Sequence, residues 1–202
     1  MGSRRRVLVT GFGPFDERAV NTSAAVLEHL PPQVGDCEII TEILPVSWAE
    51  TPKALQGALS RTSPVIAVGL GMSRNPWVAL ERIAVNFRAL DRLDGTGSRA
   101  PHERIADDGP LAYRSDLRLE SLQRRLEVAG VPVRISGSAG DYLCNAVFYL
   151  LMRARTSGVP RRAGFIHLPP LPDDSGLPLK ESILAVRTVL DLVCADAVSE
   201  RG

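Results

Sequence analysis

A cysteine and a histidine in this sequence have the types and positions that nucleophilic catalysis requires. Cys144 lies in the first turn of a helix predicted to begin at Leu143, directly after a run of small residues at 136–141. Unpaired N–H groups and the positive end of the helix dipole stabilise an anion there, which favours a reactive thiolate. The alternative is a buried, inert thiol, because free cysteine is among the most buried residue types. The position alone leaves both interpretations open.

His167 is the candidate partner of this cysteine. It lies at the carboxyl end of a predicted strand at 163–168, and Cys144 follows the carboxyl end of another at 131–136. Both ends lie at the same edge of an open parallel sheet, so we expect the two side chains to meet, although a lone histidine on an apolar strand is also typical of a core. A Cys–His pair needs a third group that orients the imidazole, and a carboxylate does this well. The pattern leaves four candidates: Glu81, Asp91, Asp94 and Asp173.

The sequence gives weaker support to dinucleotide binding, to a serine nucleophile and to a metal site. The glycine-rich turns at 11–16 and 69–74 lack the G-x-G-x-x-G pattern of dinucleotide sites, because Asp16 and Arg74 replace the last glycine. Ser138 lacks the G-x-S-x-G spacing of a nucleophile elbow. There is no H-E-x-x-H motif and no cluster of cysteine and histidine, so we predict no metal and no cofactor.

Two phenylalanines, Phe12 and Phe15, occupy the turn after the first predicted strand. Turns of this kind lie at the edge of an α/β sheet where ligands bind. The two rings therefore either line an apolar pocket or fill the edge of the sheet as part of the core.

The composition indicates one globular domain, residues 1–202, with 45% hydrophobic and 23% charged residues. A net charge of +1 argues against a large basic surface for nucleic acid. No apolar run approaches membrane-spanning length, and 7–9 is too short for the core of a signal peptide. Three cysteines without a C-x-x-C pair suggest a reducing compartment. We therefore expect a cytoplasmic protein, in which Cys194 either packs as a thiol or pairs between subunits.

Predicted strands and helices alternate along the chain. Short apolar runs predict strands at 5–10, 38–44, 65–70, 131–136 and 163–168. Helical spacing predicts helices at 21–30, 49–61, 117–129, 143–158 and 179–198. The alternation favours an α/β fold with a parallel sheet and helices on both faces. We expect the polar stretch 91–116 to form a long irregular connection, which in a compact domain is usually functional.

Several ordered segments resemble pyroglutamyl peptidase I, the pyrrolidone-carboxylate cysteine peptidases, over nearly the whole chain. The segments are VTGFGPF at 9–15 with Asn21 and Ser23, LPV at 44–46, ERIAVN at 81–86, DGP at 108–110 with Tyr113, SGSAGDYLCN at 136–145 with Tyr149, and GFIHLP at 164–169. The resemblance implies a three-layer α/β/α sandwich with a mostly parallel central sheet. It also implies a homo-oligomer, either a tetramer or a dimer.

The family's catalytic positions fall on Cys144, His167 and Glu81, so the resemblance selects one of the four carboxylates. It implies a cysteine exopeptidase that removes N-terminal pyroglutamate from peptides through a thioester. Pyroglutamate is a flat, neutral lactam that suits an aromatic slot with few polar groups. The resemblance places Phe12 and Phe15 around that ring. We predict three further substrate-binding residues, Asn21, Leu70 and Tyr142, with Arg74 near the site.

The sequence departs from the family pattern at two places. Leu70 replaces a glutamine in GLGMSR at 69–74, and Asp91 replaces an arginine near the active site, with Arg92 beside it. Asp91 would reverse the local charge. Two alternatives therefore stay open: a hydrolase of another cyclic amide or acyl group on the same triad, and a non-catalytic protein that kept the fold.

Overall fold

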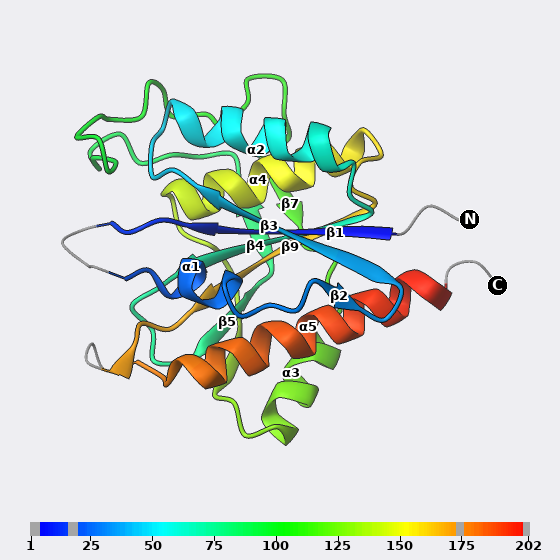
Figure 1. Cartoon of the computed structure of the whole chain (residues 1–202). Helices are drawn as coiled ribbons and strands as arrows, with labels where there is room; N and C mark the ends of the chain where they lie inside the picture. Colours follow the sequence, from blue (N-terminus) through cyan, green and yellow to red (C-terminus); the bar gives the residue numbers. More distant parts are fainter. Residues whose placement is uncertain (1–4, 16–19, 173–175, 200–202) are drawn as a thin grey trace.

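The computed structural model of the chain describes residues 5–15, 20–172 and 176–199, so Asp16 and Asp173 lie outside it. Helices cover both faces of a central sheet: α2 and α4 lie on one face, and α1, α3 and α5 lie on the other (Figure 1). The helices are α1 (Thr22–Leu27), α2 (Glu50–Thr62), α3 (Leu119–Val128), α4 (Leu143–Thr156) and α5 (Leu179–Ser199). The predicted α/β fold with three layers is confirmed.

Within the described residues, the main sheet has the strand order β2-β3-β1-β4-β9-β5-β8. Its strands are β1 (Arg5–Phe12), β2 (Gln33–Val34), β3 (Cys37–Leu44), β4 (Ile66–Met72), β5 (Val78–Glu81), β8 (Val133–Ser136) and β9 (Arg162–Leu168). A separate hairpin is formed by β6 (Ile83–Val85) and β7 (Ala112–Arg114). Part of the stretch expected to be irregular, 91–116, is therefore a strand.

The strand directions divide the sheet into two blocks. β3, β1, β4 and β9 run parallel to one another. β5 runs antiparallel to β9, and β8 runs parallel to β5. The carboxyl end of β8 therefore points opposite to that of β9, which makes our expectation that both ends lie at one edge wrong for β8. The loop 137–142 returns the chain to the edge where His167 lies.

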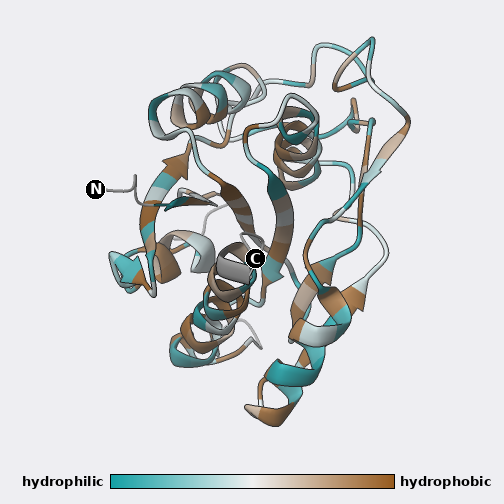
Figure 2. Cartoon of the chain, turned by 90° about the vertical axis from the view of Figure 1, so that its right-hand side faces the viewer, coloured by the Kyte–Doolittle hydropathy of each residue, from teal (hydrophilic) through white to brown (hydrophobic). Residues whose placement is uncertain are grey.

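A hydrophobic core fills the space on each side of the sheet. The core beneath α1, α3 and α5 includes Val7, Val68 and Val189, and the core beneath α2 and α4 includes Leu8, Leu55 and Phe165. Alternate residues of a strand point to opposite faces, so the fully apolar β4 contributes to both cores. Figure 2 shows apolar residues concentrated on the strands and along the helix sides that face them.

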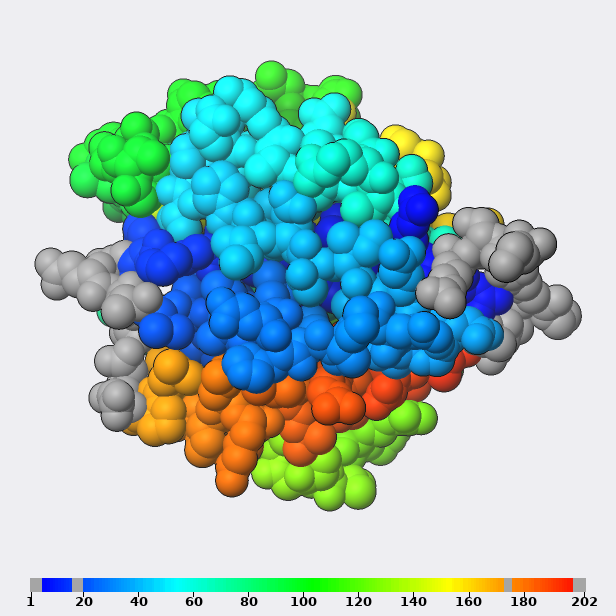
Figure 3. Space-filling view, viewed as in Figure 1, coloured from blue at the N-terminus to red at the C-terminus, as the bar shows by residue number. Residues whose placement is uncertain are grey.

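The edge of the sheet carrying β2 and β3 lies between the two helical layers. Figure 3 shows these strands, in lighter blue, between α2 in cyan and α5 in orange to red. Among the described residues, no helix is both long and apolar enough to cross a membrane.

Candidate active site

His167 and Glu81 meet on the same face of two neighbouring strands. In the antiparallel register Glu81 of β5 lies opposite Phe165 of β9, and Ala79 lies opposite His167. Side chains two positions apart on adjacent strands are diagonal neighbours. His167 Nδ1 lies 2.7 Å from Glu81 Oε1, and both side chains are almost completely buried. The structure therefore brings one predicted carboxylate to the imidazole.

The other predicted carboxylates lie elsewhere. Asp94 is buried but accepts hydrogen bonds from the backbone N–H groups of Trp48, Thr96 and Ser98. Asp91 is exposed. Asp173 lies outside the described residues.

Cys144 reaches the same point from the opposite direction. It is the second residue of α4, whose N-cap residue, Tyr142, makes no capping hydrogen bond with its side chain. The first helical hydrogen bond runs from Ala146 N–H to Tyr142 C=O, so the N–H groups of 143–145 have no partner within the helix. The Cys144 side chain is partly buried, and its sulfur and the His167 ring both lie against the Cα of Gly71, close enough to interact electrostatically.

The surroundings of His167 favour its charged form. Burial alone would lower the pKa of the imidazole. The interactions with Cys144, followed by those with Glu81, outweigh burial and raise the pKa of His167 to about 10. The imidazole is therefore in its charged form at neutral pH, beside Cys144 and in contact with Glu81.

Gly71 provides the space in which these groups meet, and our sequence analysis did not identify it. It lies on β4 directly opposite His167. A Cβ atom at this position would lie 2.7 Å from Cys144 Sγ and 3.1 Å from His167 Cδ2. Glycine inside an apolar strand often marks such a close approach, but the sequence pattern predicts Gly69 and Gly71 as part of a glycine-rich turn, whereas both lie in β4.

A cavity of about 380 Å³ opens beside Cys144. Phe12, Phe15 and Tyr142 line it, together with Cys144, His167 and Glu81. The centres of the Phe15 and Tyr142 rings are 5.6 Å apart, and Trp48 meets Tyr142 edge-on at 5.1 Å. Both phenylalanines line the cavity, but Phe12 is only 3% exposed and also belongs to the core beneath α2 and α4, so the structure agrees with the pocket for Phe15 and with both interpretations for Phe12.

Asn21 lines the cavity and fixes the loop that carries the phenylalanines. Its Oδ1 accepts a hydrogen bond from Ser23 N–H and caps α1. Its Nδ2 donates to Gly13 C=O, between the two phenylalanines in sequence. The side chain therefore joins a helix start to one wall of the cavity.

Two residues predicted to lie near the substrate are not brought to the cavity. Leu70 is fully buried in the core beneath α1, α3 and α5, because its side chain points to the face of β4 opposite Gly71. Asp91 does not line the cavity, whereas its neighbour Arg92 does. Arg92 lies over the Tyr142 ring at 4.5 Å and pairs with Asp141. This part of the cavity wall therefore still carries an arginine side chain, supplied by residue 92 and not by residue 91.

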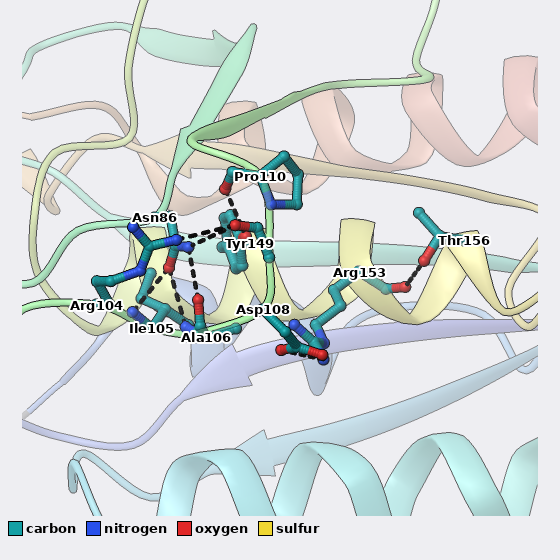
Figure 4. A network of polar contacts seen from close by, with 10 residues as sticks. Asn86, Arg104, Ile105, Ala106, Asp108, Pro110, Tyr149, Arg153 and Thr156 are labelled. Carbon is teal, nitrogen blue, oxygen red and sulfur yellow. Dashed lines mark hydrogen bonds and ion pairs between the residues drawn. The ribbon is translucent and has the colours of Figure 1, made fainter.

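The connection that follows β6 is held against α4 by polar contacts (Figure 4). Asn86 Oδ1 accepts hydrogen bonds from Ile105 N–H and Ala106 N–H. Tyr149 of α4 donates its hydroxyl hydrogen bond to Pro110 C=O, and Arg153 pairs with Asp108. The predicted long connection is thus held by Asn86, which follows β6, and by two side chains of α4.

Comparison with known proteins agrees with this geometry. The sequence model of the pyroglutamyl peptidase family matches residues 5–197. A pyrrolidone-carboxylate peptidase of Pyrococcus furiosus is 36% identical over 171 residues, which cover 83% of this chain and 82% of that protein. Pyrrolidone-carboxylate peptidase 1 of Ralstonia nicotianae is 39% identical over 170 residues, which cover 82% and 79%.

Comparison of the fold with solved structures points to the same family. The solved structure of pyrrolidone carboxyl peptidase from Thermococcus litoralis superposes with a TM-score of 0.92 at 30% identity, covering 98% of this chain and 96% of that one. The match extends over the whole sheet and both helical layers. This chain is therefore a member of the pyroglutamyl peptidase family, a family of cysteine peptidases.

Proposed function

We propose that the protein removes an N-terminal pyroglutamyl residue from peptides, with Cys144 as nucleophile, His167 as acid and base, and Glu81 as the group that orients the imidazole. The observation that carries the proposal is the 2.7 Å contact between His167 and Glu81 beside Cys144. The three residues line an aromatic cavity. The chain that carries them belongs to the pyroglutamyl peptidase family.

The reaction follows from the arrangement of these side chains. His167 takes the proton of the Cys144 thiol, the sulfur attacks the pyroglutamyl carbonyl carbon, and the carbonyl oxygen becomes an oxyanion. Unpaired N–H groups in the first turn of α4 are placed to stabilise that oxyanion. As the tetrahedral species collapses, the C–N bond breaks and the His167 imidazolium gives its proton to the leaving amine.

The second half of the reaction releases the product. Neutral His167 takes a proton from water, and the hydroxide attacks the thioester carbonyl. The C–S bond breaks, free pyroglutamate leaves, and the thiolate and imidazolium are restored. Glu81 remains ionised and holds the Nδ1–H of the ring throughout.

The cavity fits the proposed substrate. The lactam ring is flat and uncharged, and the Phe15 and Tyr142 rings, tilted by 33° to one another, offer apolar surface for it. A pyroglutamyl peptide has no charged N-terminus, so the site needs no carboxylate for recognition. Glu81, the acidic residue nearest the reacting atoms, is already engaged by His167.

The test is hydrolysis of a pyroglutamyl fluorogenic amide under reducing conditions. Wild-type protein releases the fluorophore, and Cys144→Ala, with an unchanged circular dichroism spectrum, does not. A panel of other lactam amides addresses the alternative substrate class. Absence of turnover of every amide by a folded, fully reduced wild-type protein contradicts the proposal.

We further propose one folding unit across residues 1–202, a homo-oligomeric assembly of two or four copies, and residence in the cytoplasm. A thiolate nucleophile needs a reducing compartment, and the three cysteines are free thiols. Coincident unfolding transitions by fluorescence and circular dichroism test the single unit. Analytical ultracentrifugation tests the assembly, and fractionation of the native host tests the location.

A further inference from the structure

The start of α4 is attached to another part of the chain through one buried amide. Asn145 follows the proposed nucleophile directly in sequence and is completely buried. Its Oδ1 accepts a hydrogen bond from Val85 N–H at 2.9 Å. Its Nδ2 donates to Val85 C=O at 2.8 Å and to Phe87 C=O at 3.0 Å.

These contacts determine the orientation of the amide. Both N–H groups of Nδ2 point at carbonyl oxygens, and Oδ1 faces a backbone donor. A reversed amide would place an oxygen against two carbonyls and a donor against another donor. The Asn145 amide therefore hydrogen-bonds to both backbone groups of Val85, as a neighbouring strand would. Val85 is the last residue of β6, which does not belong to the main sheet.

The partner segment continues directly from Glu81. Only Arg82 separates β5, which carries Glu81, from β6, which ends at Val85. A fourth bond runs from Ala89 N–H to Asp141 C=O at 3.0 Å. Four hydrogen bonds thus join residues 141–145, which carry the thiol, to residues 85–89, which follow the carboxylate.

We infer that Asn145 is a positioning residue: its amide sets the first turn of α4 against the chain that follows Glu81, so that the Cys144 sulfur and the unpaired helix N–H groups are held toward His167. This inference rests on the proposed function. Side chains that position reacting groups act through geometry, and a shift of about 1 Å can cost about a hundredfold in rate. Three hydrogen bonds from one buried side chain give that geometry little freedom.

A purely structural role is the competing explanation, and the chain offers a matched control. Asn86 is also a buried asparagine whose amide binds backbone groups, here of Ile105 and Ala106. It lies between the two residues that Asn145 binds, but its amide binds the connection shown in Figure 4 and makes none of the described hydrogen bonds to the first turn of α4. Loss of either amide leaves buried backbone groups without partners.

The experiment compares Asn145→Ala with Asn86→Ala. Three quantities are measured at pH 7: kcat and KM for a pyroglutamyl amide, and the rate constant for alkylation of Cys144 by iodoacetamide. For Asn145→Ala we expect kcat to fall about 10- to 100-fold, KM to change less than about threefold, and alkylation to slow about tenfold. For Asn86→Ala, whose amide anchors the same segment to a different part of the chain, we expect both rate constants to fall at least about threefold less than in Asn145→Ala, even though its melting temperature falls.

Equal effects of the two variants on kcat and alkylation, or wild-type rates in Asn145→Ala, overturn the inference. If Asn145→Ala does not fold, Asn145→Ser takes its place, because the hydroxyl retains one of the bonds, and a wild-type alkylation rate there also overturns it. The alkylation rate needs no substrate. A wild-type protein that turns over no amide, together with slowed alkylation in the Asn145 variant, would refute the proposed function and leave the positioning role supported.

Discussion

Gly71 lies directly across from His167 in the β4–β9 register, and the side chain that it lacks leaves the space beside the Cys144 sulfur. The thiol and the imidazole can therefore approach each other over the surface of β4. The approach depends on a residue that contributes no functional group. Its importance is steric, and it can be tested with a single methyl group.

Gly71→Ala is expected to lower kcat by about 10- to 100-fold, because the methyl would displace the sulfur from the imidazole. The added Cβ would lie 2.7 Å from Cys144 Sγ, closer than side-chain atoms pack. Steady-state kinetics on a pyroglutamyl amide checks this. Gly137→Ala is the control, since a Cβ there meets no atom within 4 Å. An unchanged kcat in Gly71→Ala would show that the thiol does not occupy this position during turnover.

Glu81→Gln is expected to lower kcat by roughly a hundred- to ten-thousandfold, with a smaller effect on KM. Glutamine retains the shape but not the charge, so the imidazolium loses the carboxylate 2.7 Å from Nδ1. Asp91→Asn, which removes an exposed charge outside the cavity, is expected to retain the wild-type kcat within about threefold. The two kcat values are compared at pH 7. Similar losses of kcat in both variants would mean that kcat depends on the net charge of the protein and not on the orientation of His167 by Glu81.

His167 is expected to titrate near pH 10, as its raised pKa requires. The contribution of a raised pKa to folding stability is complete below the ordinary value of 6.5 and is lost as the pH rises to about 10. NMR titration of histidine labelled with ¹⁵N follows the ring directly. In Cys144→Ala the interactions with the Cys144 side chain are missing, so the pKa of His167 falls. An identical titration in both proteins would contradict the pairing of the two side chains.

Native protein is expected to react with iodoacetamide at one of its three thiols. Cys37 and Cys194 are buried in the core beneath α1, α3 and α5, and burial raises the pKa of the Cys194 thiol. Cys144 is partly exposed at the cavity. Peptide mapping by mass spectrometry identifies the labelled site, and unfolding in guanidinium exposes all three. Rapid labelling of Cys37 in the native protein would contradict the packing of this core.

Many elements of the fold could be predicted from the sequence because each has a local cause. Short apolar runs predicted β1, β3, β4, β8 and β9, and helical spacing predicted the helices, whereas the short strands β2, β5, β6 and β7 were not predicted. The reversed direction of β5 and β8 has no such local cause. It follows from which strand the chain pairs with, a long-range choice that the alternation of elements does not encode.

The site residues also divide into those that the local sequence predicts and those that depend on long-range strand pairing. Cys144 and His167 were identified from their positions after strands, but the pattern could not choose Glu81 among four carboxylates, because the choice depends on the β5–β9 register. Leu70 was misplaced because adjacent residues of β4 point to opposite faces of the sheet. Arg92 was noted only as the neighbour of Asp91, and its contact with Tyr142 depends on how the loop folds back.

The boundary between the two strand blocks runs between β5 and β9, and His167 and the carboxylate proposed to orient it come from opposite sides of this boundary. The core beneath α1, α3 and α5 crosses this boundary, because it contains Leu80 of β5 as well as Val68 of β4. A slip of the β5–β9 register would therefore separate Glu81 from His167 and also move apolar side chains of β5 out of this core. Redesign of either block must treat this boundary as fixed.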